Sequence, residues 1–136
     1  MIRSILVGTD TSAAATIAVG EACELARTHG AELTILYVRP PIDVREVFDP
    51  ERVPDVDDYF ADLAPQLSGL DVRTRREDGD AAETICDVAA EEGVDVIVVG
   101  NRGTHGKRRW FLGSVPNAVV QHSPCSVLIV DTRVAQ

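Results

Sequence analysis

Segments typical of β-strands alternate with segments typical of α-helices along the chain, and this alternation limits the fold more than any other feature. The predicted strands cover residues 4–7, 32–38, 71–76, 95–99 and 126–130. The predicted helices cover about 13–29, 56–67, 80–93 and 114–122. Because helices that alternate with strands serve as crossovers between parallel neighbours, we predict an α/β fold: an open, parallel, five-stranded sheet with helices on both faces.

The handedness of the crossovers predicts the order of the strands. Right-handed connections put the first strand at the centre, with strands two and three on one side and four and five on the other. The expected order is therefore 3-2-1-4-5, a Rossmann-like arrangement. Ligands of such sheets bind outside the carboxyl ends of the strands where the order reverses, here between strands one and four.

Length and composition indicate one domain that covers residues 1–136. The chain is 45% hydrophobic, but no apolar run is long enough to span a bilayer, and residues 1–30 lack the pattern of a secretory signal. The three cysteines are far apart in the sequence and form no CxxC pair. Reduced, packed thiols are therefore expected rather than disulfides or a zinc site, and the predicted location is the cytoplasm.

The charge balance argues against two classes of partner. Asp and Glu number 22 against 13 Lys and Arg, which gives a formal net charge of -9. A surface with this excess of acids repels nucleic acid and anionic membranes. We therefore expect neither as a partner.

One segment reverses this balance: residues 100–114 contain no acid, four glycines and four cations. Glycine lets backbone N–H groups approach a ligand closely, and the helix predicted to follow adds further N–H donors and partial positive charge. This combination favours a cradle for a polyphosphate, with Arg102 and Lys107 among its cations. A solvated, arginine-rich turn without a ligand remains the alternative.

Asp10 follows the first predicted strand, in the turn formed by residues 8–12. The predicted topology brings this turn next to residues 100–114, at the point where the strand order reverses. A carboxylate there can accept a hydrogen bond from a ribose hydroxyl or hold a magnesium ion that bridges phosphates. The alternative is an acid that only caps the following helix.

The known phosphate motifs do not fit this chain. A Walker A loop needs four residues between its glycines and Ser or Thr after the lysine, but Arg108 follows Lys107. A dinucleotide fingerprint belongs at the first strand–helix turn, which here lacks the repeated glycines. A phospho-receiver domain needs a lysine at the end of the fifth strand, and Lys107 is the only lysine.

Two stretches resemble the universal stress protein family, in its ATP-binding branch. One is Gly100, two residues, Gly103, nine residues, then Gly113-Ser114; the other is the first strand and acidic turn, Ile5 to Ser12. The resemblance covers essentially the full length and implies the adenine nucleotide alpha hydrolase-like fold. It also implies that the nucleotide contacts Gly8, Thr9, Asp10, Val38, Val99, Gly100, Gly103, Gly113, Ser114 and Val115.

Two positions depart from the family pattern. Gly8 replaces a frequent proline, and Asn101 replaces a common small hydroxyl residue. We expect these departures to alter affinity rather than to prevent binding.

The resemblance implies an ATP-binding regulatory protein rather than an enzyme, with Mg²⁺ accompanying ATP at Asp10. No residue is a candidate catalyst, so hydrolysis of ATP is expected to be slow and incidental. An ATP-dependent transferase or adenylating enzyme and a nucleotide-free interaction protein are the alternatives. We also expect an unidentified downstream protein partner and a homodimer through the apolar fifth strand, Val127 to Val130.

Overall fold

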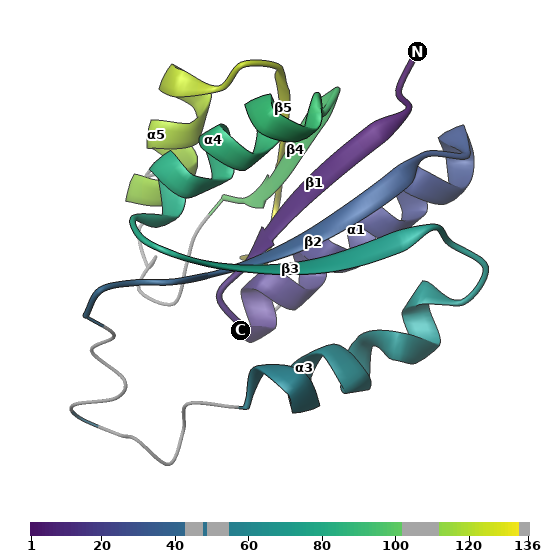
Figure 1. Cartoon of the computed structure of the whole chain (residues 1–136), viewed down its shortest axis with the longest axis horizontal. Coiled ribbons are helices and arrows are strands. Elements are labelled where there is room, and N and C mark those ends of the chain that lie inside the picture. Colours follow the sequence, from purple (N-terminus) through teal and green to yellow (C-terminus); the bar gives the residue numbers. More distant parts are fainter. Residues whose placement is uncertain (43–47, 49–54, 102–111, 134–136) are drawn as a thin grey trace.

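The computed structural model describes residues 1–42, 48, 55–101 and 112–133, and in this part of the chain five parallel strands form one sheet (Figure 1). The strands are β1 (Ser4–Thr9), β2 (Glu32–Arg39), β3 (Val72–Asp78), β4 (Val96–Gly100) and β5 (Ser126–Val130). The helices are α1 (Ala13–His29), α3 (Val56–Leu63), α4 (Ala81–Glu92) and α5 (Ser114–His122). The strand order is β3-β2-β1-β4-β5, so the predicted α/β fold and topology are confirmed.

Helices cover both faces of the sheet, and the side chains of β1 divide between two hydrophobic cores (Figure 1). Ile5 and Val7 belong to the core on the side of α1 and α3, whereas Leu6 belongs to the core beneath α4 and α5. All three are fully buried. A strand that is buried on both faces is apolar at successive positions, which explains the continuous apolar run in this part of the sequence.

The helix ends follow the capping residues predicted from the sequence. The Ser12 hydroxyl accepts from the Ala15 amide at the start of α1, and Gly30 ends that helix with a φ of 63°. At α4 the Asp80 carboxylate accepts from the Glu83 amide, and Gly93 adopts a φ of 64°. These positive angles are available to glycine at little steric cost, which is why both helices end there.

The first strand is longer than predicted. We expected it to end at Val7, but Gly8 and Thr9 also pair with β2, opposite Leu36 and Tyr37. The first two residues of the predicted turn, Gly8 and Thr9, are therefore the last two of β1. Pairing with β2 overrides the low strand propensity of glycine because both backbones are already aligned by the preceding residues.

Three other predicted boundaries were wrong. The second helix ends at Leu63 and continues as the 3₁₀ helix η2 (Ala64–Leu67), because Pro65 has no N–H to donate to an α-helical bond. The third strand lies at Val72–Asp78 rather than at 71–76. Asp95 precedes β4, and its carboxylate accepts from the backbone amides of Arg3 and Ser4 at 2.8 and 3.1 Å.

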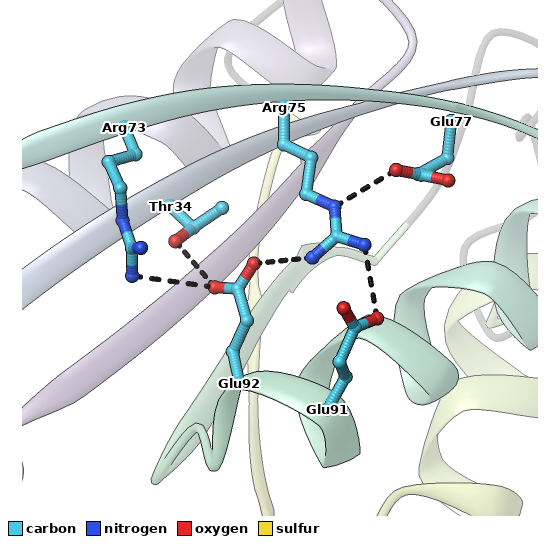
Figure 2. Close-up of polar contacts among 6 residues, drawn as sticks. All are labelled: Thr34, Arg73, Arg75, Glu77, Glu91 and Glu92. Atoms are coloured by element: carbon cyan, nitrogen blue, oxygen red, sulfur yellow. Dashed lines mark hydrogen bonds and ion pairs between the residues drawn. The ribbon is translucent and has the colours of Figure 1, made fainter.

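Strand β3 is joined to α4 by a cluster of charged side chains (Figure 2). The Arg75 guanidinium donates to Glu92 at 2.8 Å, to Glu77 at 3.0 Å and to Glu91 at 3.1 Å. Glu92 also accepts from the Thr34 hydroxyl at 2.8 Å. These carboxylates hold the pKa of Arg75 above its ordinary value, so Arg75 stays charged.

The three cysteines are free thiols. Cys23 and Cys86 are buried, and burial raises the pKa of both thiols, which keeps them protonated and unreactive at neutral pH. Cys125 is half-buried. The expectation of separate, packed thiols therefore agrees with the structure.

Candidate functional site

The candidate site lies at the carboxyl ends of β1, β2 and β4, which meet at one edge of the parallel sheet (Figure 1). β1 contributes Gly8 and Thr9, followed by Asp10. Val38 is the last residue but one of β2, and Gly100 is the last residue of β4. These residues are far apart in the sequence, and parallel pairing with β1 in the middle brings their strand ends to the same edge.

Gly8 has a packing role that the sequence did not indicate. A Cβ atom built on Gly8 would lie 2.8 Å from Cδ1 of Ile85, a buried residue of α4. Glycine therefore lets α4 pack closely against β1. A larger residue would require the Ile85 side chain to shift.

The Thr9 hydroxyl lies inside the protein, since Thr9 is only 7% exposed. It donates to the Tyr59 hydroxyl at 2.9 Å and accepts from the Thr11 amide at 3.0 Å. Thr11 has a φ of 71°, a left-handed conformation that is rare for a β-branched residue. The side chain of Thr9 thus holds the turn after β1.

Asp10 holds the same turn from the other side. Its Oδ1 accepts from the Ser12 amide at 2.9 Å, while Ser12 itself caps α1. The sequence left open whether Asp10 serves a ligand or the start of the helix. In the structure Ser12 is the N-cap and Asp10 supports the turn before it, so the role of Asp10 toward a ligand stays a prediction.

The second half of the site starts at the end of β4. Val99 is buried, and Gly100 pairs with Val130 of β5. Beyond residues 102–111, Gly113 is the N-cap of α5, and Ser114 and Val115 are the first residues of that helix. Arg102, Gly103 and Lys107 lie outside the described residues, so their predicted role stays a prediction.

Asn101 closes the base of this loop, a role that we did not predict. Its carbonyl oxygen accepts from the Gly113 amide at 3.0 Å, and its own amide donates to the Val130 carbonyl at 2.8 Å. Its side-chain Oδ1 accepts from the amide and the hydroxyl of Thr132, at 3.1 and 2.9 Å. The departure from a small hydroxyl residue at this position therefore adds a link between the loop and the end of β5.

The N-terminus of α5 differs from those of α1, α3 and α4. Ser12, Asp55 and Asp80 cap α1, α3 and α4 with side-chain oxygens. Among the described residues no side chain caps α5, because its N-cap is Gly113. Within the described part of the chain, the first amides of α5 therefore have no side-chain acceptor from their N-cap residue.

The family of the chain follows from its match to known sequences. The model of the universal stress protein family matches residues 1–131. The chain belongs to the universal stress protein family. Its match thus extends from the N-terminus to just beyond β5 and includes every strand of the sheet.

Individual universal stress proteins agree with this assignment. A relative from Staphylococcus haemolyticus is 32% identical over 144 residues, which cover 96% of this chain and 86% of the relative. The solved structure of the universal stress protein UspA from Lactobacillus plantarum is 31% identical, with a TM-score of 0.73, and the match covers 95% of this chain and 97% of that one.

A third relative has been solved with a nucleotide. It is a universal stress protein in complex with cAMP, 27% identical to this chain, with a TM-score of 0.77. The match covers 96% of this chain and 98% of that one. The fold of this universal stress protein is therefore shared over nearly the whole of both chains.

A pocket of about 300 Å³ opens at the opposite end of the sheet, between the end of α1 and the residues that precede β3.

Among the described residues, no helix has both the length and the apolar character that crossing a membrane requires.

Sequence reasoning missed two residues that shape the site, Asn101 and Tyr59. The unusual residue at position 101 was visible in the sequence, but its contacts with Gly113 and Thr132 depend on the pairing of β4 with β5. Tyr59 had no signal, because it lies 50 positions from Thr9 in the sequence.

Proposed function

We propose that this universal stress protein is a regulatory module that binds ATP at the carboxyl ends of β1, β2 and β4. Hydrolysis of ATP at this site is at most slow. The observation that supports the proposal is that β1, which leads into the Asp10 turn, and β4, which precedes the loop to the N-terminus of α5, are neighbours at the point where the strand order reverses. A relative solved with cAMP supports an adenine nucleotide as the class of ligand.

The proposed phosphate site consists of the start of α5 and the preceding basic loop. Gly113 caps α5 without a side chain, so the amides of Ser114 and Val115 can donate to phosphate oxygens. Arg102 and Lys107 would add positive charge that most of this chain lacks, given its net charge of -9. Both features favour a ligand that carries several negative charges, such as a triphosphate.

The proposed nucleoside contacts come from the other two strands. Val38 is buried near the end of β2 and belongs to the same hydrophobic core as Val99 and Ile85. An adenine ring that lies on this edge of the core would meet Val38 and its backbone. Gly8, Thr9 and Asp10 would then line the ribose side.

Magnesium enters the proposal only together with the nucleotide. Among the described residues, no group of three or more His, Cys, Asp or Glu side chains is placed to hold a metal ion. Asp10 is the carboxylate that follows β1 at this edge of the sheet, and one carboxylate with phosphate oxygens and water is a usual environment for Mg²⁺. Chelation of Mg²⁺ should therefore weaken ATP binding without unfolding the protein.

A homodimer through β5 is the second part of the proposal. The strand consists of a serine followed by four apolar residues, and Leu128 remains 39% exposed. An exposed apolar edge of this kind is stabilised when it pairs with a second copy. An unidentified protein partner would receive the signal of the nucleotide-bound dimer.

The substitution Gly113→Asp tests the nucleotide site. Aspartate is a favourable N-cap residue, so α5 should be preserved or stabilised, while the carboxylate would repel phosphate. We expect isothermal titration calorimetry to show Mg-ATP affinity lowered at least about a hundredfold, because placing like charges next to each other costs several kcal/mol. Gly20→Asp on α1 is the matched control, because a Cβ there meets only the Gln66 side chain of η2, at 3.7 Å.

Two outcomes would contradict the proposal. One is unchanged Mg-ATP affinity in a folded Gly113→Asp protein. The other is equal binding of adenosine and ATP, which would remove the role of the phosphates. Titrations with AMP, ADP and cAMP identify the preferred nucleotide, and the emission of Trp110, the only tryptophan, gives a second signal from within the basic loop.

A further inference from the structure

Four hydroxyl and backbone groups around Tyr59 form a continuous chain of hydrogen bonds. The Thr11 amide donates to Thr9 Oγ1 at 3.0 Å, and Thr9 Oγ1 donates to Tyr59 Oη at 2.9 Å. Tyr59 Oη lies 2.9 Å from Thr16 Oγ1, which in turn donates to the Ser12 carbonyl at 2.9 Å. Both ends of this series of hydrogen bonds, the Thr11 amide and the Ser12 carbonyl, lie in the turn after β1.

The direction of each bond follows from the number of protons. A hydroxyl has one hydrogen to donate. Thr16 gives its hydrogen to the Ser12 carbonyl, so Tyr59 must donate to Thr16 and must accept from Thr9. Every hydroxyl in the chain thus donates once and accepts once. Hydrogen bonds aligned in this way polarise one another and gain strength together.

Tyr59 is the member of this chain that comes from elsewhere in the fold. It lies on α3, whereas the other members belong to β1, α1 and the turn between them. Its ring packs against the core on the α1 side of the sheet, so its hydroxyl is brought to Thr9 by tertiary packing. Thr9 is buried, so water does not readily replace the Tyr59 hydroxyl.

The turn that is held in this way contains a conformation that needs support. Thr11 has a φ of 71°, which costs a β-branched residue free energy unless its surroundings impose it. Thr9 Oγ1 accepts from the Thr11 amide, and Tyr59 fixes the orientation of that hydroxyl. Asp10 lies between these two threonines.

From this arrangement we infer that Tyr59 is a positioning residue of the nucleotide site. Through Thr9 and Thr16 its hydroxyl holds the turn that carries Asp10, and it thereby sets the position of the carboxylate toward the nucleotide. The inference rests on the proposed function and extends the site to α3. It assigns no direct contact between Tyr59 and the ligand.

The test is Tyr59→Phe, which keeps the ring in the core and removes the hydroxyl. We expect the Thr11 amide to exchange with solvent several-fold faster in hydrogen-exchange NMR of the nucleotide-free protein. Mg-ATP affinity, measured by calorimetry, should fall about three- to tenfold, because this is the change in affinity that the loss of one hydrogen bond typically causes. Thermal unfolding shows whether each variant remains folded.

Thr16→Val tests the other end of the chain and has a matched control. Thr16 and Thr28 both lie on α1, and each hydroxyl donates to the carbonyl four residues before it. Thr28→Val should therefore have the same local cost to the helix without affecting Thr11 exchange or ATP affinity. The double variant Tyr59→Phe/Thr16→Val should lose less binding free energy for ATP than the sum of the losses in the two single variants, because both changes interrupt the same chain of hydrogen bonds.

The outcomes separate this inference from the proposed function. Unchanged Thr11 exchange in Tyr59→Phe would overturn the positioning role, whatever the ATP affinity. Faster exchange with an ATP affinity equal to that of the wild type would overturn the link to the nucleotide. A wild-type protein that binds no nucleotide would instead refute the proposed function, while the exchange measurement would still decide whether Tyr59 holds the turn.

Discussion

The sheet ends in two edge strands of opposite construction. β3 has five charged side chains among its seven residues, whereas β5 has none among its five. Arg75 on one face of β3 binds carboxylates of α4, and on the other face Arg76 pairs with Asp57 of α3 and lies over the Phe60 ring. Leu128 of β5 remains 39% exposed.

This difference shows how one sheet can prevent pairing with another chain at one edge and allow it at the other. Charged residues on an edge strand disfavour pairing with another chain, because pairing would remove their water. On β3 the charges also join the strand to a helix on each face of the sheet. β5 lacks both forms of protection, which is why we propose it as the dimer edge.

The largest expected effect is on the oligomeric state. Leu128→Arg puts a charge on the apolar edge and should weaken the proposed dimer by at least about 2 kcal/mol, as the loss of a central interface residue does. Sedimentation equilibrium measures the change. Thr74→Arg on β3 adds the same charge to the other edge and should leave the oligomeric state unaltered. A wild-type protein that is monomeric at micromolar concentration would contradict the proposed dimer through β5.

The second effect is on stability. Arg75→Met leaves the carboxylates of Glu77, Glu91 and Glu92 without their common partner, and we expect the free energy of unfolding to fall by about 1–3 kcal/mol. Urea denaturation followed by circular dichroism measures the loss. The double variant Arg75→Met/Glu92→Met should recover part of it, since it removes one of the three carboxylates that lose Arg75; among the described residues, Glu92 keeps only the Arg73 ion pair at 3.9 Å and the Thr34 hydroxyl. No loss in Arg75→Met would mean that the cluster does not hold β3.

A smaller effect separates the two edges by their response to salt. Raising the ionic strength to about 1 M shortens the Debye length to ~3 Å and screens the partly exposed cluster on β3. The difference in melting temperature between the wild type and Arg75→Met should therefore shrink. Dimerisation through apolar β5 should not weaken in the same titration. A dimer that dissociates as salt rises would show that charges, rather than β5, hold it together.

The smallest effect concerns the centre of the sheet, away from both edges. The Arg3 and Ser4 amides hold the pKa of Asp95 below its ordinary 3.8. A lowered pKa in the folded state stabilises the protein above pH 3.8, and the contribution disappears as the pH falls through the folded value. Asp95→Asn should flatten the acid limb of the stability curve below pH 3.8, measured by thermal unfolding. An identical acid limb in both proteins would contradict this assignment.

The sequence predicted the fold well because its signals are local and repeated. Capping residues such as Ser12 and Gly30 determine the ends of α1, and apolar runs determine the inner strands. Boundaries were less certain wherever pairing with another strand decided them. Thr9 belongs to β1 only because β2 offers a partner at Tyr37.

The candidate site was predicted in part. The strand ends that carry Asp10, Val38 and Gly100 meet at one edge, as the topology required. Residues 102–111 lie outside the described part of the chain, so the basic loop remains a prediction. The contacts of Asn101 and Tyr59 were not predictable, because each joins segments that only the folded chain brings together.

By itself, the sequence determined the family, the α/β architecture, the order of the strands and the charge of the two edges. These properties follow from the periodicity of apolar residues, the glycine spacing and the residue types present. Only the tertiary structure decided how Gly8 admits α4, how Asn101 closes the loop and how Tyr59 reaches Thr9. Such contacts depend on distances of a few ångströms between distant segments, and close packing sets those distances only when the whole core has formed.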